Sequence, residues 1–136
     1  MPTGVQQTTA RRLHTQQVNY LRISVNYNDP GIANGVGKQW LPAGALIIGT
    51  DCYGGAAFNA GTTNVLTIGT NSAAYNNIMT PPVTAATLTQ NAAPTGTALG
   101  PLAADTQVFV KYTQTGGAAT AGNAIFCVKF VPANDM

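Results

Sequence analysis

Residues 106–131 read TQVFVKYTQTGGAATAGNAIFCVKFV, and this stretch decides the expected fold. Apolar and polar residues alternate with a period of two at both ends, which is typical of β-strands with one buried face. We expect one strand over Thr106–Thr115 and another over Asn123–Val131. The small-residue segment between them, Gly116–Gly122, is expected to be a flexible hairpin loop. The chain therefore closes with two long strands, which favours an all-β fold.

The same alternation identifies the faces of the strands that are expected to be buried. It also predicts a strand over Val18–Tyr27, which ends at the turn signal Asn28–Gly31. The residues expected to share one face of their strand are Leu21, Ile23, Val25 and Tyr27 in the first strand, Val108, Val110 and Tyr112 in the second-last, and Ala124, Phe126, Val128 and Phe130 in the last, whose other face, with Ile125, Cys127 and Val131, is also largely apolar.

Two further strand-like runs lie in the middle of the chain, at Ala45–Tyr53 and Asn64–Thr70. They are joined by Gly54–Thr63, a loop of small residues with one large apolar side chain, Phe58. Phe58 either folds back on the core or reaches a neighbouring molecule. The first alternative is favoured, because a lone aromatic residue among glycines and alanines most often anchors its own loop.

The remaining segments carry weaker patterns. Ser72–Met79 is ambiguous and could form one helical turn, and Pro81-Pro82 interrupts any regular element after it. Short strands are expected at Lys38–Leu41, Val83–Gln90 and Thr97–Leu99. The sequence thus predicts an antiparallel β-sandwich, a jelly roll of about eight strands, over residues 18–136. Residues 1–17 are polar and mildly basic, and are expected to form an extended N-terminal arm.

The composition of the chain argues against several classes of function. Only 7% of the 136 residues are charged and the formal net charge is +2, so the dense basic face of a nucleic-acid-binding protein is not expected. No run of 18 apolar residues is present, so the sequence predicts no membrane span. The N-terminus lacks the apolar segment of a secretory signal. We therefore expect a protein that is made in the cytosol, where thiols are reduced.

The two cysteines and the single tryptophan each allow two interpretations. Cys52 and Cys127 are expected to be free, small, buried residues within strands; a disulfide between them is the minority alternative. Trp40 is expected in the core or at the edge of the sandwich. The alternative is that Trp40 anchors an interface, because tryptophan is enriched in binding hot spots.

The residues needed for catalysis are scarce. The only histidine, His14, lies in the expected arm, where no rigid element would hold it for a nucleophilic triad. The four acidic residues are all aspartates, and Asp29, Asp105 and Asp135 fall in expected turns or at the terminus. Clustered ligands for zinc or calcium and a phosphate-binding loop are absent from the sequence. The sequence predicts neither an enzyme nor a cofactor.

Several segments resemble the cement, or head-decoration, proteins of short-tailed bacteriophages. The resemblance covers roughly residues 18–132 and contains no catalytic signature. The segments that carry it are WLPAGA (40–45), AFNAGTTN (57–64), LTIGT (66–70), LGPLAAD (99–105), VFVKYT (108–113) and ATAG (119–122).

This resemblance implies a jelly roll that binds the outside of the capsid shell as a dimer and clamps neighbouring capsomers. The implied partner is the major capsid protein, and the implied location is the exterior of a virion assembled in the host cytoplasm. The residues that we expect to contact the partner are Arg11, Arg12 and His14 in the arm and Trp40 in the domain. The alternative function is a carbohydrate- or receptor-binding module of a virion fibre, since β-sandwiches host many such sites.

Overall fold

The computed structural model describes residues 18–91, 94 and 98–132 of the chain. Residues 1–17, expected to form the arm, lie outside this part, so the division into an arm and a domain stays a prediction. The described part consists of strands and turns, without an α-helix. The strands are β1 (Asn19–Asn26), β2 (Val36–Leu41), β3 (Leu46–Ala56), β4 (Thr63–Gly69), β5 (Leu88–Asn91), β6 (Thr106–Thr115) and β7 (Asn123–Val131).

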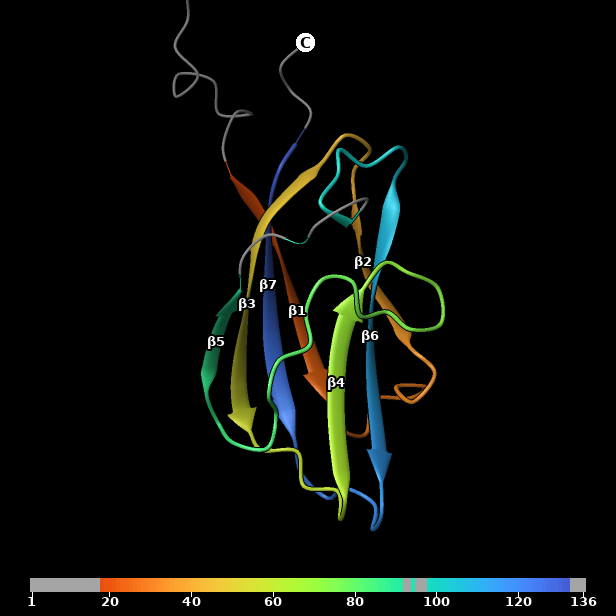
Figure 1. Cartoon of the computed structure of the whole chain (residues 1–136), viewed down its shortest axis with the longest axis vertical. Coiled ribbons are helices and arrows are strands. Elements are labelled where there is room, and N and C mark those ends of the chain that lie inside the picture. The colour runs from red at the N-terminus through yellow and green to blue at the C-terminus, as the bar shows by residue number, and fades with distance from the viewer. Residues whose placement is uncertain (1–17, 92–93, 95–97, 133–136) are drawn as a thin grey trace, which may run out of the picture.

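These strands form two antiparallel sheets that pack face to face, which confirms the predicted β-sandwich (Figure 1). Sheet A has the order β1-β7-β3-β5, and sheet B has the order β2-β6-β4. The three strands β1, β2 and β3, consecutive along the chain, alternate between the two sheets. The jelly-roll arrangement itself stays a prediction.

The core lies between the sheets and is built from the alternate residues expected from the sequence. Leu21, Ile23 and Val25 of β1 point inward, whereas Tyr27 is only partly buried at the edge of the cluster. In the last two strands the residues predicted to share a face are together buried: Val108, Val110, Tyr112, Ala124, Phe126, Val128 and Phe130.

The prediction that the last two strands form a hairpin is wrong. Thr106–Thr115 forms β6 in sheet B, whereas Asn123–Val131 forms β7 in sheet A, so the two strands face each other across the core. Each pairs with strands distant in sequence: β6 with β2 and β4, and β7 with β1 and β3. Gly116–Gly122 therefore crosses between the sheets at one end of the sandwich (Figure 1).

Three weaker expectations also need correction. Val83–Gln90 becomes a strand only from Leu88, because the preceding residues after Pro81-Pro82 make single backbone bonds to loops and to the end of β3 rather than a ladder. Ser72–Met79 contains turns and one bridge to β4; the bond from the Tyr75 amide to the Asn71 carbonyl closes a single turn, but Ala73 and Tyr75 have positive φ, so this turn is not one of right-handed helix. Within Thr97–Leu99, Thr97 lies outside the described residues and the next two are not in a strand. The described part thus has seven strands, which agrees with the expected number of about eight.

The loop before β4 closes one end of the sandwich, and Phe58 inserts from it into the core. The side chain is 2% exposed, and its ring centroid lies 4.7 Å from that of Tyr112. Gly122 covers Phe58 from the opposite loop: its φ of 146° is in the range that favours glycine, and a Cβ there would lie 2.6 Å from the Phe58 ring. The prediction that Phe58 anchors its own loop is confirmed.

Candidate interaction surfaces

The structure places one of the four predicted contact residues. Trp40 lies on β2, an edge strand of sheet B, and its side chain is 58% exposed. Of the two positions expected for Trp40, the edge of the sandwich is confirmed and the core is wrong, because the next residue, Leu41, takes the inward position and is fully buried. Arg11, Arg12 and His14 lie outside the described residues.

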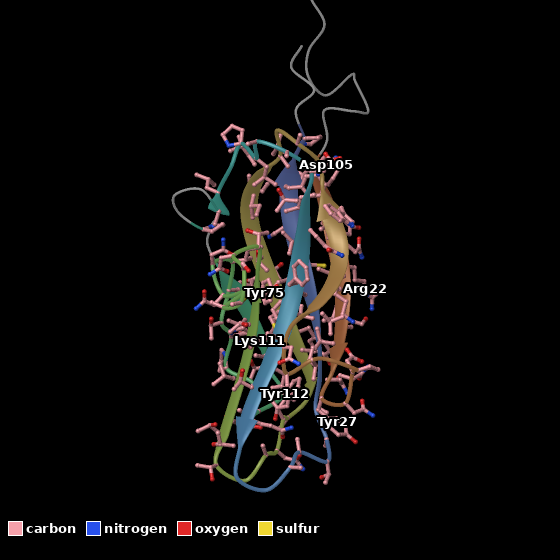
Figure 2. The ribbon with its side chains drawn as sticks, turned by 90° about the vertical axis from the view of Figure 1, so that its right-hand side faces the viewer. Arg22, Tyr27, Tyr75, Asp105, Lys111 and Tyr112 are labelled. Atoms are coloured by element: carbon pink, nitrogen blue, oxygen red, sulfur yellow. The ribbon has the colours of Figure 1, made fainter. Side chains whose placement is uncertain are left out.

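Trp40 borders a part of sheet B that the chain covers with its own loop. Trp40 pairs with Gln107 of β6, and Phe109, two residues further along β6, stacks on Tyr75 with ring centroids 4.5 Å apart. The Lys111 ammonium donates a hydrogen bond of 3.0 Å to the carbonyl of Ala73 in the same loop. Figure 2 shows Tyr75 and Lys111 close together over β6. The covering loop thus leaves Trp40 exposed beside it.

Asparagine side chains hold this loop in an unusual backbone conformation. Tyr75 has a φ of 46°, which is uncommon for a residue other than glycine. The Asn71 carboxamide oxygen accepts hydrogen bonds from the backbone amides of Asn76 and Asn77, at 2.8 and 3.2 Å. The Asn77 carboxamide in turn accepts a bond from the Thr70 amide and donates one to the Thr70 hydroxyl. Together these hydrogen bonds hold the loop in one backbone conformation, which keeps Tyr75 stacked on the sheet.

The two cysteines are free, as expected, and point to opposite faces of sheet A. Cys52 pairs with Phe126 and is 2% exposed, whereas Cys127 is paired with Asp51 and is half-buried on the outer face. The prediction that both cysteines are buried is thus confirmed for Cys52 and wrong for Cys127. Desolvation raises the pKa of the Cys52 thiol from 9.0 to about 11.

This buried thiol makes stability depend on pH. In the unfolded chain Cys52 ionises near pH 9, whereas in the folded chain it stays neutral up to a pKa of about 11. Its contribution is thus fully present below pH 9 and is lost as the pH rises towards 11, by up to about 2 kcal/mol. Between pH 8.5 and 10.5, we expect the free energy of unfolding, measured with urea, to fall more steeply for the wild type than for Cys52→Ala. Cys127→Ala is the matched control, and equal slopes in wild type and Cys52→Ala would contradict the prediction.

Residues 18–91, 94 and 98–132 contain neither a metal-binding cluster nor a helix suited to a membrane. In that part of the chain, no three side chains of the metal-binding types gather into a group that could hold an ion. The same residues contain no helix that is long and apolar enough to cross a membrane. The features that remain are exposed side chains on the faces of the sandwich.

Comparison by sequence finds no match, either to a protein-family model or to a curated protein. Comparison by structure finds chains in phage capsids. A chain in the capsid of Ralstonia phage GP4 has a TM-score of 0.61 and 18% identity, over 88% of this chain and 86% of that one. A chain in the capsid structure of Helicobacter pylori bacteriophage KHP30 has a TM-score of 0.58 and 12% identity, over 85% and 89%.

A third chain, from the capsid asymmetric unit of cyanophage Pam1, has a TM-score of 0.55 and 13% identity, over 85% of this chain and 84% of that one. Each match extends over most of both chains, so the likeness concerns the whole sandwich and not one sheet. The chain therefore shares its β-sandwich fold with chains found in the capsids of three bacteriophages.

Proposed function

We propose that this chain is a cement protein that binds the outside of a phage head and stabilises the contacts between neighbouring capsomers. The observation that carries the proposal is the fold shared, almost end to end, with chains of three phage capsids. The sequence resemblance to head-decoration proteins supports the same role. The partner is then the major capsid protein, bound by a homodimer of this chain, and assembly takes place in the host cytoplasm.

The physics of cementing suits a small domain with few charges. One contact with a capsomer can be weak, because a molecule that bridges two subunits raises the effective concentration of each contact for the other. Only 7% of the residues are charged, so contacts made by this surface would depend little on salt. Strong binding to the shell therefore does not require a highly charged or large interface.

Purification of the virus that encodes this chain tests the proposal. We expect the chain to remain with intact heads through density-gradient centrifugation, in a copy number comparable to that of the major capsid protein. Heads assembled without the chain should disrupt at a lower temperature than complete heads. Absence of the chain from mature particles would end the proposal.

Removal of residues 1–17 is expected to weaken binding to the shell while the domain stays folded. The segment carries Arg11, Arg12 and His14, three groups that can pair with acidic side chains of a partner. We expect a roughly tenfold loss of affinity for heads assembled without the chain, with an unchanged circular dichroism spectrum. The matched control replaces only Arg11, Arg12 and His14 by alanine. Unchanged affinity in both variants would exclude the segment from binding.

A carbohydrate- or receptor-binding module of a virion fibre is the second candidate, and the exposed Trp40 favours it. An indole ring that is open to solvent can stack on the apolar face of a sugar. Binding on a glycan array that disappears in Trp40→Ala would support this alternative. Trp40→Ala that lowers affinity for phage heads instead would assign Trp40 to the capsid contact.

A further inference from the structure

The two outer faces of the sandwich differ in how much apolar surface they leave open. On sheet B the covering loop occupies the centre, with Tyr75 stacked on Phe109. On sheet A large apolar side chains stay open: Tyr20 is 64% exposed, Tyr53 55% and Leu88 62%. A sheet face packed only against water usually carries polar side chains. Sheet B exposes Trp40 and Val65, at 58% and 41%, so within the described part of the chain sheet A carries the larger share of the exposed apolar side chains.

The strand register gathers these side chains into rows across the sheet. One row runs from β7 through β3 to β5 and consists of Ile125, Tyr53 and Leu88, which are direct partners on adjacent strands. Towards the other end of the sheet lie Tyr20 on β1 and Ile48, which is 45% exposed at the irregularity in β3. We call this outer face of sheet A, with Arg22 between its two apolar parts, the A face.

Arg22 gives the A face a positive charge between the two apolar parts. It lies in the middle row, opposite Cys127, whose other neighbour is Asp51. Asp51 already has a partner, because the Lys129 ammonium lies 3.5 Å from its carboxylate. Among the described residues Arg22 has no ionic partner, and Figure 2 shows it projecting from the margin of the molecule. The uncompensated charge of the described A face is therefore that of Arg22.

We propose that the A face is the surface by which this chain docks on the capsid shell, against an apolar patch that presents a carboxylate to Arg22. The inference rests on the proposed function for the identity of the partner. Tyrosine and arginine are enriched in the hot spots of protein interfaces. A single uncompensated cation is too little for nucleic acid, whose binding requires several phosphate contacts. A protein surface with an acidic group is the partner that this chemistry fits.

The size of the A face agrees with a contact that is repeated over a shell. Four strands about 4.8 Å apart, with about 3.3 Å per residue along the eight residues of β1, give a face on the order of 500 Å². Specific interfaces bury about 800 Å² per partner, so the A face is at the small end of the range. A clamp also needs a second contact, and Trp40 on the other sheet offers one that can be tested independently.

The test measures binding of the full chain to heads assembled without it. Tyr53→Thr/Leu88→Thr removes apolar surface from the A face while keeping residues that favour strands. Arg22→Glu reverses its charge. We expect the double variant to lose at least tenfold in affinity and Arg22→Glu a similar amount. The matched control is Val65→Thr, at a position on β4 of sheet B that is 41% exposed, and it should bind as the wild type does.

Chemical modification of the wild type gives a second measurement that does not depend on the folding of a variant. Tetranitromethane should nitrate Tyr20 and Tyr53 in the free chain, and binding to heads should protect both. If the wild type does not bind heads, the proposed function fails. If it binds and both A-face variants bind equally well, or if both tyrosines stay reactive on heads, only the present inference is overturned. A homodimer that is lost in Tyr53→Thr/Leu88→Thr would assign the A face to a second copy, which also overturns it.

Discussion

Replacement of Phe58 by alanine is expected to lower the free energy of unfolding by about 3–5 kcal/mol. The ring is 2% exposed and packs on Tyr112, with an angle of 54° between the ring planes. Its removal leaves a cavity beneath two loops that are tied together by backbone bonds, such as the 2.8 Å bond from the Gly61 amide to the Gly117 carbonyl, so the site cannot collapse freely. Urea unfolding should show the loss, and the melting temperature should fall by about 10–20 °C.

A double-mutant cycle with Gly122 tests the reason for this effect. Gly122→Ala alone should destabilise the protein, because the new Cβ meets the Phe58 ring in addition to the unfavourable φ. In the Phe58→Ala background the two ring contacts at 2.6 Å are absent, whereas the backbone strain and the 3.0 Å approach to the Phe58 Cα remain. The cost of Gly122→Ala should thus fall by about 1 kcal/mol or more. A loss below about 1 kcal/mol for Phe58→Ala, or additive effects in the cycle, would contradict this picture of the closed end.

The period-two alternation predicted the inner faces well because it depends only on neighbouring residues. A strand in a sandwich has one side in the core, so Leu21, Ile23 and Val25 had to lie together wherever the strand was placed. The same rule also predicts the outward direction of Trp40, for which core and edge were both considered, and of Cys127, which was expected to be buried. Trp40 precedes the buried Leu41, and Cys127 lies between the buried Phe126 and Val128, so alternation puts both outward. The general burial tendencies of tryptophan and cysteine were the weaker argument.

The partners of each strand could not be predicted in the same way. Pairing is decided by contacts between residues far apart in the chain, such as Leu21 with Val128 or Leu66 with Tyr112. The loop Gly116–Gly122 fits a hairpin as well as a crossing between sheets, and only the competing partners of β6 and β7 exclude the hairpin. The A face could not be predicted from the sequence for the same reason. Tyr20, Tyr53 and Leu88 belong to strands that meet only after the sheet has formed.

Asn64→Ala is expected to destabilise the protein by about 2–3 kcal/mol, because Asn64 satisfies several polar groups at the closed end of the sandwich. Its carboxamide oxygen accepts a hydrogen bond from the Tyr112 hydroxyl and one of 2.8 Å from the Ala60 amide. Its amide nitrogen donates a bond of 3.2 Å back to the Ala60 carbonyl. Tyr112 is 1% exposed, and burial raises its pKa, so its hydroxyl stays protonated and needs an acceptor.

The matched control for this change is Asn59→Ala in the preceding loop. Asn59 also accepts two backbone bonds, from Thr120 and Ala121, but it is exposed, so water can replace it and the cost should stay below about 1 kcal/mol. Tyr112→Phe removes the hydroxyl that Asn64 satisfies. Asn64→Ala should therefore cost less in the Tyr112→Phe background than in the wild type, by about 1 kcal/mol in urea unfolding. Equal costs for Asn59→Ala and Asn64→Ala would mean that the buried hydroxyl does not depend on Asn64.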